Sequence, residues 1–192
     1  MTGFWEANQR ALERRSDPDS RRLAGSLGGP GPDWGLRSRK SEVLPGWNAP
    51  GRPRSLVSGY DPEKEAQRWA SAINGGTVAV FGGAGTAAAQ ALADRSVRLM
   101  FWVEPRIEVW QSLLTWEDWT PWLNREDWVP VFSDAEAWGQ RLKNRYHPLW
   151  DGAFRSLEWR SAVEGASVDW EKFLRTALAS LDGLAADAST QA

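Results

Sequence analysis

A glycine-rich turn and a later glutamate carry the spacing in this chain that is most typical of ligand binding. The turn fits the fingerprint G-x-G-x-x-(G/A) with Gly83, Gly85 and Ala88. In such a turn the first glycine permits a sharp bend, the second lets the backbone approach a ligand, and the small third residue lets the helix pack against the strand. Glu104 lies 19 positions after Gly85, near the spacing expected of the acid that accepts hydrogen bonds from ribose hydroxyls.

The helix that starts after this turn would present free backbone N–H groups and a partial positive charge to an anion. A nucleotide or nucleotide sugar is therefore a candidate ligand, and S-adenosylmethionine is an alternative, because its ribose would meet the same glutamate. A parallel strand–helix unit also needs a glycine turn for packing alone, so a domain without a ligand remains open. The residues predicted to contact the ligand are Gly82, Gly83, Gly85, Thr86 and Glu104.

Two apolar runs and a small-residue helix surround the turn. Residues 77–81 are a short apolar run typical of a strand buried on both faces. Residues 86–93 predict a helix that Thr86 is placed to cap, and residues 98–103 predict a second strand that ends at Glu104. This order is the first half of a Rossmann-like unit, and it predicts a small three-layer α/β domain with a parallel sheet and right-handed crossovers.

Capping residues mark further helices on either side of this unit. Asp61 is a good N-cap and Pro62 suits the first helical position, while residues 74–76 (Asn-Gly-Gly) would stop the helix. Another helix is expected to start at Pro105. Residues 146–160 show no clear pattern.

A third strand is predicted at residues 128–132, and Pro130 places it at an edge of the sheet or shortens it. Ser133 or Asp134 would then cap a helix that runs to about Arg145.

The chain divides into three predicted parts. Residues 1–54 form an N-terminal helix plus a Gly/Pro-rich arm, residues 55–185 form the Rossmann-like domain, and residues 186–192 form a disordered tail. Residues 16–54 are expected to be either mobile or a set of extended pieces laid on a partner surface. The basic residues of the arm favour a solvated linker over phosphate binding, because no aromatic residues alternate regularly with them. An amphipathic helix is predicted at residues 168–184.

Composition limits the classes of function that are open. The 192 residues carry a net charge of −2, which argues against a dedicated nucleic-acid-binding protein. The absence of cysteine excludes disulfides and thiolate metal sites, and a single histidine, His147, excludes a histidine-rich metal site. No apolar run approaches 18 residues and no signal peptide opens the chain, so neither membrane insertion nor export is expected and the predicted location is cytoplasmic.

The 14 tryptophans are an unusual number for this length. Three of them, Trp116, Trp119 and Trp122, recur every third residue and would share one face of a helix. A large aromatic core is the favoured interpretation, because each ring buries much area and needs a partner only for its N–H group. A stacking platform for a base, a sugar or another protein is the alternative.

Catalytic motifs are sparse. His147 precedes a proline in an irregular segment, and the sequence contains neither a G-x-S-x-G elbow nor a G-x-x-x-x-G-K-(S/T) phosphate loop. Two carboxylate pairs, Glu117/Asp118 and Glu126/Asp127, each adjoin a tryptophan that could raise a pKa by desolvation. Solvated loop acids are the more common interpretation of such pairs, because neighbours in sequence do not face each other on a helix or strand.

Four motifs occur in the order FWEANQRAL, SGYDPEKEAQRW, VAVFGGAGTAAAQAL and VEPRIEVW. This order resembles the N-terminal half of the motility accessory factor proteins, bacterial flagellin glycosyltransferases related to the 6-hydroxymethylpterin diphosphokinase-like group. The likeness covers roughly residues 4–160. Its most specific part is a Tyr-Asp-Pro-x-x-Glu-Ala element, matched here by Tyr60, Asp61, Pro62, Glu65 and Ala66.

Other positions of the family pattern are also present. Phe4 and Asn8 match the aromatic residue and asparagine of its opening helix. The remaining matches lie in the glycine turn and the Val-Glu-Pro strand end: Gly83, Gly85, Val103, Glu104 and Pro105. The family's usual turn is closer to Gly-Leu-Gly-Leu-Gly-Tyr, so the large residues beside the pocket are missing at residues 82–87. The Gly-Pro-Ser-Leu turn that opens the family's transfer domain does not occur after Arg160.

The resemblance implies a Rossmann-like accessory domain of a flagellin or protein glycosylation system, without the family's downstream transfer domain. Flagellin or a separate transferase subunit would be its partner, and Tyr60 and Asp61 become further candidate site residues. A methyltransferase-like domain that binds S-adenosylmethionine and a structural or interaction domain without a ligand are the two alternatives.

Overall fold

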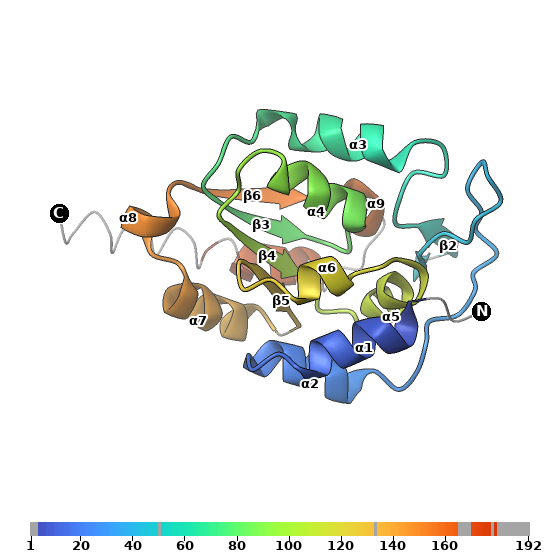
Figure 1. Ribbon diagram of the computed structural model, residues 1–192, viewed down its shortest axis with the longest axis horizontal. Coiled ribbons are helices and arrows are strands. Elements are labelled where there is room, and N and C mark those ends of the chain that lie inside the picture. The colour runs from blue at the N-terminus through green and yellow to red at the C-terminus, as the bar shows by residue number, and fades with distance from the viewer. Residues whose placement is uncertain (1–3, 50, 133, 165–169, 178, 180–192) are drawn as a thin grey trace.

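The computed structural model describes residues 4–49, 51–132, 134–164, 170–177 and 179. A four-stranded parallel sheet lies between two layers of helices, and N-terminal helices and a small antiparallel hairpin precede it (Figure 1). The strands of the main sheet are β3 (Thr77–Phe81), β4 (Leu99–Val103), β5 (Trp128–Val131) and β6 (Phe154–Glu158).

The order of these strands across the sheet is β5-β4-β3-β6. The chain therefore starts at β3, moves outward through β4 to β5, and then crosses to the other side of β3 to form β6. This is the topology of a doubly wound sheet, whose ligands bind at the carboxyl ends of the strands where the winding reverses. The predicted three-layer α/β fold is confirmed.

Alternate strand residues face different helical layers. Val78 pairs in register with Met100, and Val80 with Trp102; these side chains pack with helices α1 to α6. The other face is contributed by residues such as Phe101 and packs against α7 and residues 170–177. The central strands β3 and β4 are buried along their whole length because helices cover both faces. The helices are α1 (Trp5–Glu13), α2 (Pro18–Ser26), α3 (Pro62–Trp69), α4 (Thr86–Ala93), α5 (Ile107–Trp116), α6 (Thr120–Leu123), α7 (Ala135–Arg145), α8 (Pro148–Asp151) and α9 (Arg160–Val163), with a 3₁₀ turn at Ala70–Ala72 after α3.

Most predicted helix starts are confirmed, but the helix expected at Pro105 starts at Ile107 and one cap is different. Asp61 caps α3 by accepting from the Lys64 amide at 2.9 Å, and Asp134 caps α7 by accepting from the Ala137 amide at 2.8 Å. The prediction that Thr86 caps α4 is wrong. Thr86 is the first helical residue, and the N-cap position belongs to Gly85, which has no side chain to offer.

The two edge strands differ in how clearly the sequence marks them. Pro130 lies in β5, which among the described strands pairs with β4 alone and is an edge strand as predicted. Its missing N–H group therefore leaves no gap inside the sheet. Strand β6 occupies the opposite edge and has a mixed sequence, FRSLE, with several exposed side chains. That lack of an apolar pattern is the reason residues 146–160 gave no strand prediction.

The segment after α1 is more regular than expected. Asp17 caps α2 by accepting from the Ser20 amide at 2.9 Å, and β1 (Gly46–Ala49) and β2 (Arg52–Ser55) form an antiparallel hairpin. The hairpin packs on α5, where the Gly46 amide donates to the Ser112 hydroxyl at 2.7 Å. This segment is therefore laid on the chain's own helices over the described residues.

Tryptophans fill the space between the sheet and the covering helices. The ring centres of Trp102 and Trp119 lie 5.6 Å apart, and those of Trp119 and Trp128 lie 5.3 Å apart. These rings are fully buried, as is Trp110, so the core interpretation holds for them. The expectation that Trp116, Trp119 and Trp122 share one helix face is wrong, because α5 ends at Trp116 and α6 starts after Trp119.

The last described residues cover the α7 face of the sheet. Residues 170–177 are helical, and the Ala177 carbonyl accepts from the Trp138 indole N–H at 3.2 Å. Much of the predicted 168–184 helix, and the tail at 186–192, lies outside the described residues. Within the part of the chain that is described, no helix has the length and apolarity needed to cross a bilayer.

Candidate functional site

The glycine turn lies at the carboxyl edge of the sheet, beside the end of β4. Gly82 adopts a φ of +99°, a conformation that favours glycine, and its amide donates to the Val103 carbonyl at 3.0 Å. Glu104 follows β4 directly, and its amide donates to Val131 at 3.1 Å. The structure therefore brings the predicted turn and the predicted acid to the same edge of the sheet.

A carboxyl group of the chain itself occupies the start of α4. The Thr86 amide donates to Oε2 of Glu117 at 2.9 Å. A Cβ atom added at Gly85 would lie 2.6 Å from Oε1 of the same side chain. Glu117 therefore sits where a bound anion would meet the first amide of this helix.

Asn8 of α1 fixes the position of Glu117. Its side-chain amide donates at 2.8 Å both to the Leu114 carbonyl and to the Glu117 carbonyl, and its Oδ1 accepts from the Trp119 amide at 2.9 Å. Asn8 is fully buried, and its bonds to the Leu114 carbonyl and the Trp119 amide are shielded from water. The asparagine of the opening helix thus positions the backbone that carries the carboxyl group.

Burial raises the pKa of Glu117 to about 7, against the opposing effect of the hydrogen bond from the Thr86 amide. Near neutral pH the group is therefore close to half ionised. A carboxyl group with such a pKa is suited to proton transfer, but here its oxygens lie against Thr86 and Gly85 of its own turn.

Asp118 and Glu126 are solvated loop acids, whereas Asp127 is held in an ion pair with Arg125. Asp118 is exposed and accepts from the Thr120 amide at 3.0 Å. The Arg125 guanidinium lowers the pKa of Asp127 below its ordinary value. Burial therefore sets Glu117 apart, whereas Asp118 is exposed and Asp127 is paired with Arg125.

Glu104 is fully buried and is engaged by Arg106. The guanidinium donates from Nε to Oε1 at 2.8 Å and from Nη2 to Oε2 at 2.7 Å, and the Arg106 amide donates to Oε1 at 2.9 Å. Burial raises the pKa of Glu104, and the guanidinium counteracts this rise. Arg106 itself lies between two rings, with Cζ 4.6 Å from the ring centre of Trp47 and 4.8 Å from that of Trp170.

Apolar side chains fill the remaining space over the turn. A Cβ atom added at Gly83 would lie 2.1 Å from Cγ1 of Val109, and one added at Gly85 would lie 2.5 Å from Cγ1 of Val57. The close approach that a fingerprint glycine offers to a ligand is used here by residues of α5 and of the segment after β2. Between β3 and β6, where the winding reverses, Ala162 of α9 lies against Gly82: a Cβ atom added at Gly82 would lie 3.0 Å from Cβ of Ala162.

The other two candidate residues lie apart from the turn. Asp61 is the N-cap of α3, and Tyr60 is 74 % exposed with the Arg39 guanidinium 5.1 Å from its ring centre. Both residues line a shallow depression of about 460 Å³ whose other lining residues are Ser58, Lys64, Glu65 and Arg68.

Groups for nucleophilic or metal chemistry are not assembled in the described part of the chain. His147 is exposed, and its backbone N–H donates to Oδ2 of Asp151 at 2.7 Å. No cluster of three or more His, Cys, Asp or Glu side chains among the described residues could hold a metal ion.

Comparison of the chain with family models, with curated proteins and with solved structures finds no match.

Three residues, Arg106, Glu117 and Val109, occupy the groups and the space that a ligand would use, and the sequence did not predict these roles. Arg106 follows Glu104 by two positions, and that spacing in E-P-R was the available signal for the ion pair. Glu117 and Val109 reach the turn from α5 and its end, which only the folded topology reveals.

Proposed function

We propose that this chain is a noncatalytic Rossmann-like accessory domain that acts through contacts with another protein. The observation that carries this proposal is the occupied turn: the Glu117 carboxyl group takes the first amide of α4. The acid expected to bind ribose supports the same conclusion, because Arg106 already uses both oxygens of Glu104.

A nucleotide or nucleotide sugar at this turn would have to displace both groups. Removing Arg106 from Glu104 would leave a fully buried carboxylate without its partner, which is costly. A ligand that approached the glycine backbone would also require Val57 and Val109 to move, because their side chains lie over Gly85 and Gly83. S-adenosylmethionine meets the same obstacle, because its ribose would need Glu104.

The resemblance in sequence gives the narrower form of the proposal, a domain of a flagellin glycosylation system. Asn8 and Asp61, two of the residues that carry that resemblance, have structural roles here: Asn8 fixes the 114–119 segment and Asp61 caps α3. Asn8 thus supports an architecture in which a carboxyl group of the chain itself, Glu117, occupies the turn. The partner would be flagellin or a separate transferase subunit.

Two experiments on the purified chain test this proposal. Immobilised chain should retain purified flagellin or the transferase subunit encoded with it. In calorimetry, S-adenosylmethionine should give no saturable heat, and any heat from a nucleotide sugar should be the same for wild type, Glu104→Gln and Glu117→Gln. Failure to retain either protein, together with a nucleotide-sugar affinity that changes in Glu104→Gln or Glu117→Gln, would overturn the proposal.

A further inference from the structure

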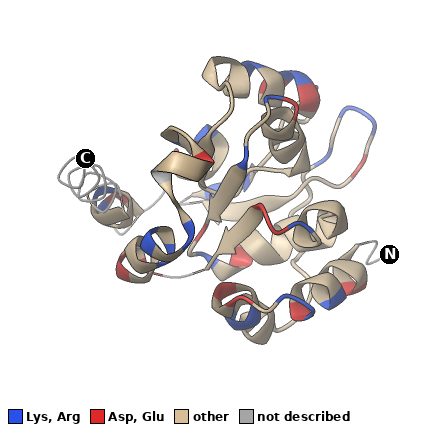
Figure 2. Ribbon diagram, turned by 60° about the vertical axis from the view of Figure 1, so that its left-hand side comes forward, with Lys and Arg blue, Asp and Glu red and all other residues tan. Residues whose placement is uncertain are grey.

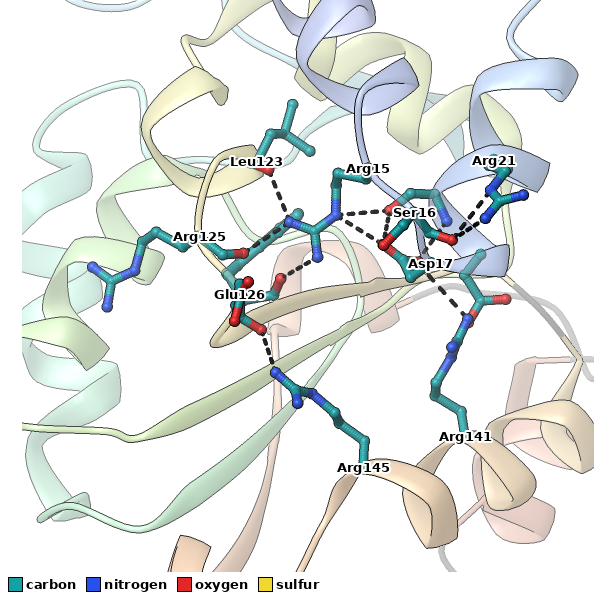
Figure 3. Close-up of polar contacts among 12 residues, drawn as sticks. Arg15, Ser16, Asp17, Arg21, Leu123, Arg125, Glu126, Arg141 and Arg145 are labelled. Atoms are coloured by element: carbon teal, nitrogen blue, oxygen red, sulfur yellow. Dashed lines mark hydrogen bonds and ion pairs between the residues drawn. The ribbon is translucent and has the colours of Figure 1, made fainter.

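A second concave region lies beside the start of β5, away from the glycine turn. This pocket of about 490 Å³ is bounded by the end of α1, the segment that leads into β5, and α7. Figure 3 shows Arg15 reaching from the end of α1 to the segment before β5, and Arg141 and Arg145 reaching up from α7. The residues that matter for its chemistry are Arg14, Arg15, Asp17, Glu126, Arg141 and Arg145.

Arg15 is a fixed wall of this pocket. Its Nη1 donates to the Leu123 and Arg125 carbonyls and its Nη2 to the Trp128 carbonyl, at 2.8 to 2.9 Å. Its Nε donates to Asp17 at 2.9 Å. These bonds use four of the five N–H groups of the guanidinium, so Arg15 mainly shapes the pocket and contributes charge to it.

The other guanidinium groups keep donors available. Arg141 and Arg145 are four residues apart and so share one face of α7. Arg145 donates from Nη2 to the Glu126 carbonyl at 2.8 Å, and Arg141 donates from Nε to Asp19 at 2.8 Å. Among the described contacts the exposed Arg14 side chain makes no hydrogen bond, so several N–H groups of these three residues remain for a ligand.

The acidic side chains around the pocket differ in how strongly they would repel an anion. Asp17 and Asp19 are already engaged by Arg15 and Arg141, whereas Glu126 is exposed and opposes an anion. Figure 2 shows charges of both signs interspersed over the helices, in keeping with 23 basic and 25 acidic residues in the whole chain. Against that background, five of the twelve residues that line this pocket are arginines, although Arg15, Arg125 and Arg141 are each paired with an aspartate.

We propose that this pocket binds a small molecule carrying a phosphomonoester or diphosphate group, held by Arg14, Arg141 and Arg145. Guanidinium groups form forked, charge-assisted hydrogen bonds that suit phosphate oxygens. The volume exceeds that of a single ion and falls in the range of small-molecule sites. Ala11, Leu123 and Val129 give the pocket an apolar part against which the organic portion of the ligand packs.

Calorimetric titration of the full chain with ADP and with inorganic pyrophosphate tests the proposal. Both should bind saturably at low salt, and adenosine should not bind. The double variant Arg14→Ala/Arg145→Ala should weaken ADP binding by about tenfold or more, because two charge-assisted contacts are lost. Glu126→Gln should strengthen it about two- to fivefold, because a like charge is removed.

Two matched variants make the result specific. Arg10→Ala/Arg52→Ala removes two exposed arginines outside the pocket and should leave ADP affinity unchanged. Glu117→Gln should also leave it unchanged, which separates this pocket from the glycine turn and makes the outcome independent of the proposed function. If Arg14→Ala/Arg145→Ala does not fold, Glu126→Gln still tests the proposal, because it should raise the ADP affinity instead of lowering it. Absence of saturable binding at millimolar ADP, or equal affinity in wild type and both pocket variants, would overturn the proposal.

Discussion

The Glu117 carboxyl group does within the chain what a bound phosphate does in other glycine-turn domains: it meets the first amide of the helix that follows the turn. The difference is that this anion is tethered and titratable. Its protonation state should therefore be visible in the stability of the fold itself.

Stability should depend on pH through Glu117. The ordinary pKa of the group is 4.5, and burial raises it to about 7 in the folded chain. Between these values the folded state binds the extra proton, so the free energy of unfolding falls as pH rises, by at most about 3 kcal/mol for this group. The stability that the protonated Glu117 contributes is fully present below pH 4.5 and is lost above about pH 7.

Glu117→Gln isolates that contribution, because the amide oxygen can still accept from Thr86. The variant should match wild type at pH 4 and exceed its stability by about 1–3 kcal/mol at pH 8, as measured by urea unfolding. Glu171→Gln, at an exposed position, is the matched control and should follow wild type at both values. Identical pH profiles for wild type and Glu117→Gln would contradict the assignment.

Gly83 should be intolerant of even one added methyl group. Because a Cβ atom there would lie 2.1 Å from Val109, Gly83→Ala should destabilise the fold by about 1–3 kcal/mol. In urea unfolding, the double variant with Val109→Ala should lose less than the sum of the two single changes. Gly28→Ala, where nothing lies within 4 Å, should stay within about 0.5 kcal/mol of wild type. Strict additivity at Gly83 and Val109 would show that the contact is not the cause.

At the scale of elements, Arg15 joins the α1–α2 corner to the segment that leads into β5. Its guanidinium is largely buried and donates to three backbone carbonyls of that segment and to Asp17. The contact ties residues more than 100 positions apart in the sequence. It therefore contributes to docking the N-terminal helices on the sheet.

Arg15→Ala should lower the free energy of unfolding by about 2–4 kcal/mol. The change leaves buried carbonyls without a hydrogen-bond donor and removes the partner of Asp17. Arg14→Ala, at the neighbouring exposed position, should change it by less than about 0.5 kcal/mol. Urea unfolding of the two variants side by side gives the comparison. A similar loss for both would mean that net charge, and not this set of bonds, holds the corner in place.

Elements with strong local signals were predictable, and elements defined by tertiary contacts were not. The strand at 77–81, the helix at 86–93 and the caps at Asp61 and Asp134 follow from apolar runs and capping chemistry. Strand β6 and the β1–β2 hairpin have mixed or Gly/Pro-rich sequences, and their structure depends on pairing with β3 and packing on α5.

The candidate site shows the same division. The fingerprint predicted where the turn and Glu104 would lie, because strand ends and helix starts are local features. It did not predict that Glu117 and Val109 would fill the space, because α5 lies beside the turn only after the sheet has formed. A ligand-binding motif therefore specified the backbone without specifying whether the space above it is open.

At the scale of the whole molecule, the N-terminal segment and the sheet share one core. Leu12 and Leu23 of the first two helices belong to the same buried cluster as Val80 and Trp102 of the sheet. In Figure 1 α1 and α2 lie along one side of the molecule, next to α5 and α6. Folding of residues 4–49 is thus coupled to folding of the parallel sheet.

The indole cluster under α5 and α6 has an optical consequence. Ring centres of neighbouring tryptophans lie between 5.3 and 6.3 Å apart for Trp102, Trp110, Trp119 and Trp128. Because these rings are held close together in one fixed arrangement, the native chain should show an aromatic band in near-ultraviolet circular dichroism. States that keep helices but lose fixed packing lose that band. The aromatic interior is thereby a label-free spectroscopic gauge of whether the native packing is intact.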